Sequence, residues 1–197
     1  VQAAVVLIAA DGTVSDGSWD GIVNPAVQIP PAASNIHGIT NERPLREGAA
    51  PVDAPRHIGR LIAAAVEAGI PMVIYNAPFD WPFVLAETRR HGVTLRRPDI
   101  IDPLVIDRAM DRFRRGGRKL ESVAAHYGCG LVQAHDARAD AIAAAAIVRA
   151  QSARYADIRA VAPDALQPLQ AKWRSEHAES LSQHLGKPID PGWPLPT

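Results

Sequence analysis

The sequence contains a single cysteine, no net charge and no long hydrophobic run. Cys129, the one cysteine among 197 residues, excludes an internal disulfide scaffold and a zinc site built from thiolates, so we expect a reducing, cytoplasmic location. The longest apolar stretch lies between Val1 and Ala10 and is far shorter than the roughly 20 residues that span a bilayer. No basic segment precedes it, so we expect neither a membrane span nor a signal peptide.

The balanced charge excludes a wholly basic coat protein and an acidic disordered tail. The balance is not local, because residues 89–119 hold nine arginines and one lysine against four aspartates. The densest part runs from Arg108 to Lys119. A charged run of this kind is most commonly a solvated helix face, and its alternative role is to bind the phosphates of a nucleic acid.

Apolar patterning predicts strands that alternate with helices after an opening hairpin. Asp11-Gly12 follows a β-branched run and is typical of a hairpin turn, whereas the Pro-rich residues 24–41 predict an irregular connection. The expected strands cover residues 3–10, 13–23, 70–75 and 100–101, and the expected helices cover 53–68, 79–91, 103–113, 119–126 and 136–154. This order predicts an α/β fold with a mixed sheet flanked by helices.

The last part of the chain predicts an appended amphipathic helix that begins after Pro163. Its apolar residues share one helix face and are Leu166, Leu169, Trp173, Leu181 and Leu185. Such a helix packs on its own domain or on a partner, and completing its own domain is the commoner case. We therefore divide the chain into a domain at 1–155 and a helical extension at 156–197.

Two segments carry residues suited to chemistry. Asp80 follows a predicted buried strand and starts a helix, so it is either a helix cap or a side chain that faces a crevice beyond the strand. His135 lies five residues before Asp140, and both reach one small volume if a helix begins near Asp136. Alternatively, Asp140 is solvent-exposed and His135 is a loop histidine.

Together these segments resemble a known family. Asn-Ala-Pro-Phe-Asp at 76–80, followed by His-x-Ala-x-x-Asp at 135–140, is similar to the second and third motifs of the DnaQ-like (DEDDh) 3′–5′ exonucleases. That family includes the proofreading epsilon subunit of bacterial DNA polymerase III. The segments at 24–40 and 101–105 also resemble connections of the family, so the similarity extends over roughly residues 1–150 as an ordered series.

The resemblance implies a ribonuclease H-like fold and two divalent cations, Mg²⁺ or Mn²⁺, as cofactors. It implies that Asp80 and Asp140 are metal ligands and that His135 is the general base. Asn76, Phe79 and His37 fall where the family holds the terminal nucleotide, and a packing role is equally open for each. The implied partner is the 3′ end of single-stranded DNA in proofreading or repair, with a DNA polymerase subunit as a further partner. Beside these motifs, phosphate binding becomes the favoured role of the basic stretch.

The sequence departs from the family at its first motif. Asp-x-Glu is absent, and the first residues match the family's second strand, so we expect that upstream sequence on the order of two dozen residues is missing. With two carboxylates instead of four, we expect no two-metal hydrolysis from this chain alone, and we expect unpaired edges on the strands at 3–10 and 70–75. Two alternatives are an RNA-directed 3′–5′ exonuclease and a catalytically inactive DnaQ-like module that binds nucleic acid or a polymerase. Asp-x-Glu upstream of Val1 would favour the enzyme.

Overall fold

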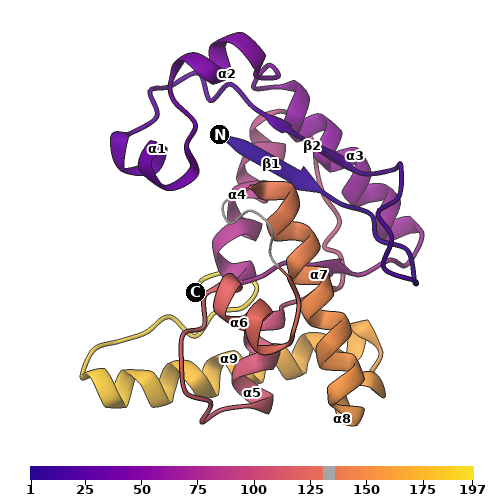
Figure 1. Cartoon of the computed structure of the whole chain (residues 1–197), viewed down its shortest axis with the longest axis vertical. Helices are drawn as coiled ribbons and strands as arrows, with labels where there is room; N and C mark the ends of the chain where they lie inside the picture. Colours follow the sequence, from indigo (N-terminus) through magenta and orange to yellow (C-terminus); the bar gives the residue numbers. More distant parts are fainter. Residues whose placement is uncertain (131–135) are drawn as a thin grey trace.

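The structure, a computed structural model, describes residues 1–130 and 136–197. In the described part of the chain, no helix combines the length and apolar character needed to cross a membrane. The elements follow one another (Figure 1) as β1 (Gln2–Val5), β2 (Trp19–Ile22), α1 (Pro31–His37), α2 (Glu42–Glu47), α3 (Asp53–Glu67), β3 (Met72–Val73), α4 (Ala77–Arg90), β4 (Ile100–Ile101), α5 (Pro103–Met110), α6 (Leu120–His126), α7 (Ala137–Arg154), α8 (Ala156–Arg159) and α9 (Pro163–Leu185).

The strands form two separate ladders. β1 pairs with β2 in antiparallel fashion, with Gln2 opposite Ile22, and β3 pairs with β4 in parallel, with Met72 opposite Ile100. Helix α7 packs against both β1 and β3 and so connects the two ladders (Figure 1). Within the described residues, β1 and β3 each have one neighbouring strand and one unpaired edge, as we expected for these two segments.

The predicted hairpin at Asp11-Gly12 is confirmed. Asp11 Oδ1 accepts hydrogen bonds from the backbone N and the hydroxyl of Thr13, and Gly12 adopts a φ of +96° that a side chain would disfavour. An isolated bridge between Ile8 and Val14 continues the pairing toward the turn. The regular strands are shorter than predicted, because the hydrogen-bonded ladder proper covers only four residues on each side.

The prediction of an irregular connection at residues 24–41 is wrong in part, because this segment contains α1. Pro30 is the extended N-cap residue, and Pro31 occupies the first helical position, where its missing N–H costs nothing and its fixed φ suits the helix. The helix ends at Gly38, whose φ of 70° is left-handed and whose N–H donates to Ser34 O. The Pro30-Pro31 pair therefore begins this helix rather than preventing it.

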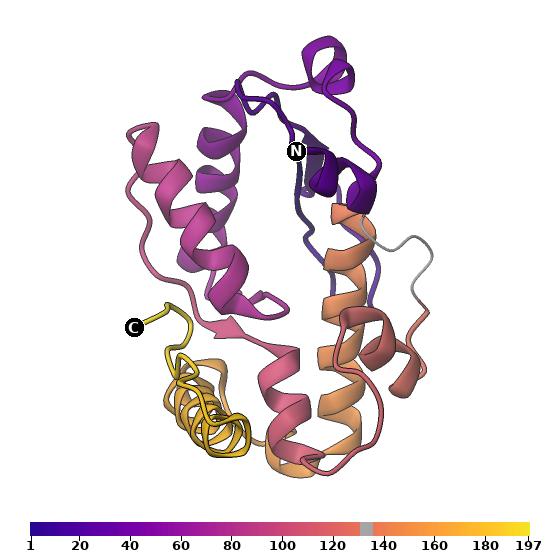
Figure 2. The same ribbon diagram turned by 90° about the vertical axis from the view of Figure 1, so that its left-hand side faces the viewer.

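Three hydrophobic clusters hold the helices on the ladders. The first is centred on Trp81, which is 1% exposed, and joins α3, α4 and β4 through Ile62 and Ile100. The second joins α5, α8 and α9, and the third joins α6 to α7 (Figure 2). The helix predicted after Pro163 is confirmed, and it packs on α5 and β4 of its own chain.

Candidate active site

Asp80 lies on the first turn of α4, just beyond the end of β3. Asn76 links the two elements with φ 60° and ψ 53°, a left-handed conformation that asparagine tolerates better than most residues. Helix α4 then begins at Ala77, two residues earlier than the sequence predicts. A carboxylate in the first turn interacts favourably with the partial positive charge of the helix N-terminus. The Asp80 side chain is exposed to solvent at this position.

A buried carboxylate, Asp102, fixes the start of α4. Asp102 is 0% exposed and caps α5, where its Oδ1 accepts a hydrogen bond from Leu104 N at 3.0 Å. The same oxygen accepts from Asn76 N at 3.0 Å, and Oδ2 accepts from Ala77 N at 2.9 Å. These two N–H groups lie at the beginning of α4 and would otherwise lack partners, so one side chain holds the N-termini of two helices together.

The C-terminal extension completes the surroundings of Asp102. Trp193 Nε1 donates to Asp102 Oδ2 at 3.3 Å, and the backbone N of Asp102 donates to Gln170 Oε1 of α9 at 2.7 Å. Burial raises the pKa of Asp102, and this effect outweighs the opposite influence of the hydrogen bonds. The sequence indicated Asp102 only as a helix cap; its contacts with Asn76 and Trp193 have no local sequence signal.

Asp140 brings a second carboxylate to the site from α7. Asp136 caps this helix, since its Oδ1 accepts from Ala139 N at 3.0 Å, and Asp140 therefore falls in the first turn, as the sequence predicted. Part of the Asp80 side chain contacts solvent, but the surrounding protein removes some of the water that would stabilise its negative charge. This desolvation, together with the negative charges of Asp102 and Asp140, raises the pKa of Asp80 to about 6. Asp80 and Asp140 therefore influence one another electrostatically.

The donor set of these two residues suits a divalent cation only in part. Carboxylate oxygens are the ligands that Mg²⁺ and Mn²⁺ favour, and a cation would relieve the repulsion between Asp80 and Asp140. No group of three or more His, Cys, Asp or Glu side chains within residues 1–130 and 136–197 is arranged to hold a metal ion. Asp102 is no third ligand, because its oxygens are occupied by N–H donors. The described residues thus fit part of the shell of one cation and not a pair.

The other predicted site residues fall in different places. His135 lies outside the described residues. Asn76 and Phe79 flank the start of α4 beside Asp80, and Phe79 is 63% exposed with its ring at 5.7 Å from that of Phe83. His37 ends α1, where its Nδ1 accepts from Ile39 N at 3.1 Å. No hydrogen bond or ion pair of the described chain joins His37 to Asp80.

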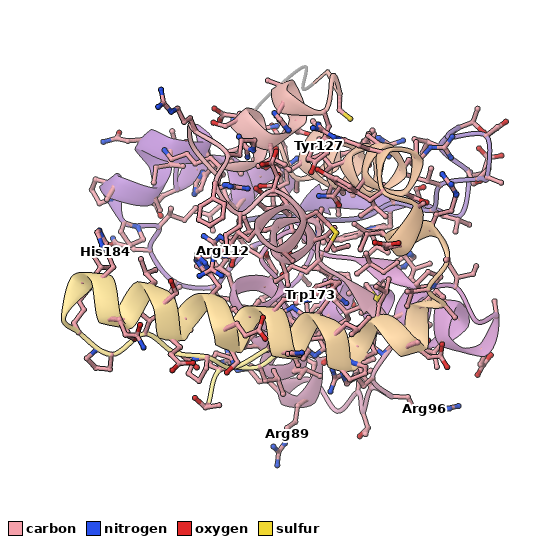
Figure 3. All side chains as sticks on the ribbon, turned by 90° about the horizontal axis from the view of Figure 1, so that it is seen from below. Arg89, Arg96, Arg112, Tyr127, Trp173 and His184 are labelled. Atoms are coloured by element: carbon pink, nitrogen blue, oxygen red, sulfur yellow. The ribbon has the colours of Figure 1, made fainter. Side chains whose placement is uncertain are left out.

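The structure divides the basic stretch into parts with different surroundings. Arg114 and Arg118 turn inward and form ion pairs with Asp107, whose carboxylate is fully buried. Arg89 and Arg96 project on one side of α9, whereas Arg112 lies on the other side (Figure 3). The stretch is therefore not one continuous surface, and part of its charge is neutralised inside the protein.

Two small β-ladders covered by helices, with carboxylates at the starts of α4 and α7, define an α/β protein of the ribonuclease H-like class. The RNase_T family, described as exonuclease, matches residues 3–148, which is most of the chain. The chain therefore belongs to this DnaQ-like exonuclease family. Exonucleases of this family generally use divalent metal ions.

Known proteins with sequence or structural similarity agree with this assignment. A DNA polymerase III subunit epsilon-like protein of Rhodobacter capsulatus is 28% identical over 147 residues; the match covers 74% of this chain and 20%, about a fifth, of that relative. The structure of exonuclease I is similar with a TM-score of 0.64 at 20% identity, over 79% of this chain and 37% of that one. The structure of exonuclease X in complex with 5′ overhanging duplex DNA is similar with a TM-score of 0.62 at 16% identity, over 86% of this chain and 90% of that one. At these identities the two structures support the fold.

Proposed function

We propose that this chain carries part of the active site of a metal-dependent exonuclease that removes nucleotides from the 3′ end of single-stranded DNA. The observation that carries the proposal is the pairing of Asp80 with Asp140 at the starts of two helices, with the pKa of Asp80 raised to about 6. Two carboxylates that repel each other and remain accessible to solvent are suited to share a cation.

In this proposal Asp80 and Asp140 hold a divalent cation, which supplies charge stabilisation at the scissile phosphate when it is bound. Asp102 keeps Asp80 in position through the backbone of Asn76 and Ala77. The exposed ring of Phe79 offers a stacking surface for the terminal base, and Asn76, which is also exposed, immediately precedes the same helix. His135 is proposed to accept the proton of the attacking water, a role that suits the near-neutral pKa of histidine in general.

Hydrolysis that uses two cations needs more negative charge than Asp80 and Asp140 provide. We propose that additional carboxylates complete the site and that residues 1–197 alone do not catalyse efficient two-metal hydrolysis. The polymerase partner implied by the resemblance and a role in replication or repair belong to the same proposal.

The test is a nuclease assay with Mn²⁺ on single-stranded DNA labelled at its 5′ end. The protein encoded by the complete gene is expected to shorten the DNA from its 3′ end, and Asp80→Asn or Asp140→Asn should each reduce the rate by at least about a hundredfold. Asp53→Asn, which changes an exposed aspartate on the first turn of α3, is the matched control. Equal cleavage by wild type and Asp80→Asn would refute the proposed metal ligands, and a faster reaction on RNA of the same sequence would reassign the substrate.

A further inference from the structure

Basic side chains from α5 and α9 converge at a position outside the proposed metal site. Helix α5 packs against α9, and Arg112, which follows α5, donates from Nη2 to Ser180 Oγ of α9 at 3.3 Å. Arg174, His177 and Ser180 follow one another at intervals of three residues on α9, each about one turn after the last. Figure 3 shows Arg112 beside this helix. We use the term α5–α9 basic cluster for Arg108, Arg112, Arg174 and His177.

The members of the cluster also act on one another electrostatically. Burial, and after it the charges of Arg108, Arg174, Arg118 and Arg112, lower the pKa of His177 to about 4. The pKa of Arg108 is also lowered, chiefly by burial and next by Arg174. Half-buried cations that repel one another represent an unfavourable arrangement unless an anion is present.

The acidic groups near the cluster make their closest contacts with other donors. Asp102, which favours the charged form of Arg108, accepts hydrogen bonds from backbone N–H groups and from Trp193. Asp107 Oδ2 is taken by Arg114 and Arg118. The Asp190 carboxylate accepts from the backbone N–H groups of residues 192 and 197, while its carbonyl oxygen accepts from Arg174 Nη2 at 2.7 Å.

Asp111 and Glu176 face side chains outside the cluster. The Asp111 carboxylate lies 3.5 Å from His126, and Glu176 lies 3.8 Å from Lys172. Glu179 is exposed and lies off the face of α9 that carries His177.

Two members of the cluster form no direct ion pair in the described part of the chain, although Asp102 acts on Arg108 and Asp190 acts on Arg174 from a greater distance. Within residues 1–130 and 136–197, Arg108 and Arg174 form no ion pair with a carboxylate, and residues 131–135 contain no Asp or Glu. The Nε atom of Arg174 is buried and has no hydrogen-bond partner in the described structure. A buried N–H donor without an acceptor is destabilising, so a shift of this half-buried side chain toward an acceptor from outside the chain would be favoured here.

We propose that the α5–α9 basic cluster binds a phosphate group of a single-stranded nucleic acid. Guanidinium groups bind phosphate oxygens through paired charge-assisted hydrogen bonds. Because several converging arginines can contact one phosphate together, they favour a phosphate group over a single carboxylate. The choice of a nucleic-acid strand as the source of the phosphate rests on the proposed function. The phosphate site itself depends only on the cluster, and helix α9 of the extension supplies half of it.

The experiment follows His177 by NMR in the full chain, with EDTA present so that no cleavage occurs. A short oligothymidylate is expected to raise the pKa of His177 by about one unit or more, because a bound phosphate offsets the nearby arginines. Arg108→Gln and Arg174→Gln should each weaken oligothymidylate binding about tenfold, and each lost phosphate contact should reduce the salt slope by about 0.7. Arg174→Lys should retain part of the affinity because it keeps the positive charge. Arg112→Gln changes an exposed side chain, so it tests the proposal even if Arg108 or Arg174 is needed for folding.

Lys172→Gln is the matched control, since it removes an exposed cation from another face of α9 and should leave the affinity unchanged. Unchanged affinity in Arg112→Gln and Arg174→Gln, with no change at His177, would overturn the proposal. A response of His177 to inorganic phosphate but not to oligothymidylate would overturn the assignment to a strand. Retained binding by the chain, together with no nuclease activity of the protein encoded by the complete gene, would refute the proposed function and support the phosphate site.

Discussion

Replacing Asp102 with asparagine is expected to destabilise the fold strongly, because one side chain joins α4, α5 and the C-terminal segment. Oδ1 accepts from three backbone N–H groups, and Oδ2 accepts from Ala77 N and Trp193 Nε1. Whichever oxygen becomes an NH₂ group, at least two donors then face another donor. Hydrogen bonds to a charged group contribute about 1.5–3 kcal/mol each, so the loss is about 3–6 kcal/mol.

Removing a buried charge offsets part of this loss, as the raised pKa of Asp102 indicates. We therefore expect Asp102→Asn to lower the free energy of unfolding by about 3 kcal/mol and Tm by about 6–12 °C. Urea denaturation and calorimetry measure both quantities. Trp193→Phe, which removes a single donor, should cost about 1 kcal/mol, and Asp99→Asn, at an exposed position nearby, should stay within about 0.5 kcal/mol. A loss below about 1 kcal/mol in Asp102→Asn would refute the reasoning.

Three further changes test other parts of the structure. Asp80→Asn should stabilise the chain above pH 6, and this gain should vanish as the pH falls toward 4. Because the pKa of Asp80 is raised in the folded state, its protonation in acid favours folding, and this contribution is lost as the pH rises through about 6. The variant has no carboxylate at this position and therefore does not lose that contribution. Arg118→Ala leaves the buried Asp107 carboxylate with one ion-pair partner. It should lower the free energy of unfolding, measured by urea denaturation, by about 3 kcal/mol. Gly192→Ala places a Cβ atom against the backbone oxygen of Leu195 and should cost about 1–3 kcal/mol.

Each of these changes has an outcome that contradicts it. An Asp80→Asn gain that is the same at pH 5 and pH 8, or that Asp53→Asn reproduces, would show that the shifted pKa does not cause it. Arg118→Ala with wild-type stability would mean that Arg114 alone compensates Asp107. Gly192→Ala with an unchanged Tm would mean that the C-terminal segment moves freely to accommodate the methyl group.

Short-range features were accessible from the sequence. Asp11-Gly12 predicted the hairpin, Asp102-Pro103 predicted a capped helix start, and both are confirmed. Asp136 predicted the start of α7 and hence the placing of Asp140 in its first turn. In each case the side chain bonds to a backbone group within three residues, so the pattern and its structural consequence occupy the same few positions.

The tertiary structure alone determined the contacts between distant segments. Asp102 meets Asn76 and Trp193, Arg118 turns inward onto Asp107, and Arg112 reaches α9. A helix cap and a basic run look the same in sequence whether they face solvent or another element, because burial and long-range hydrogen bonding depend on which helices pack together. The sequence thus determined the family motifs and the starts of those elements that a local side chain caps. The fold decided which charges are buried, which are paired, and which remain available to a ligand.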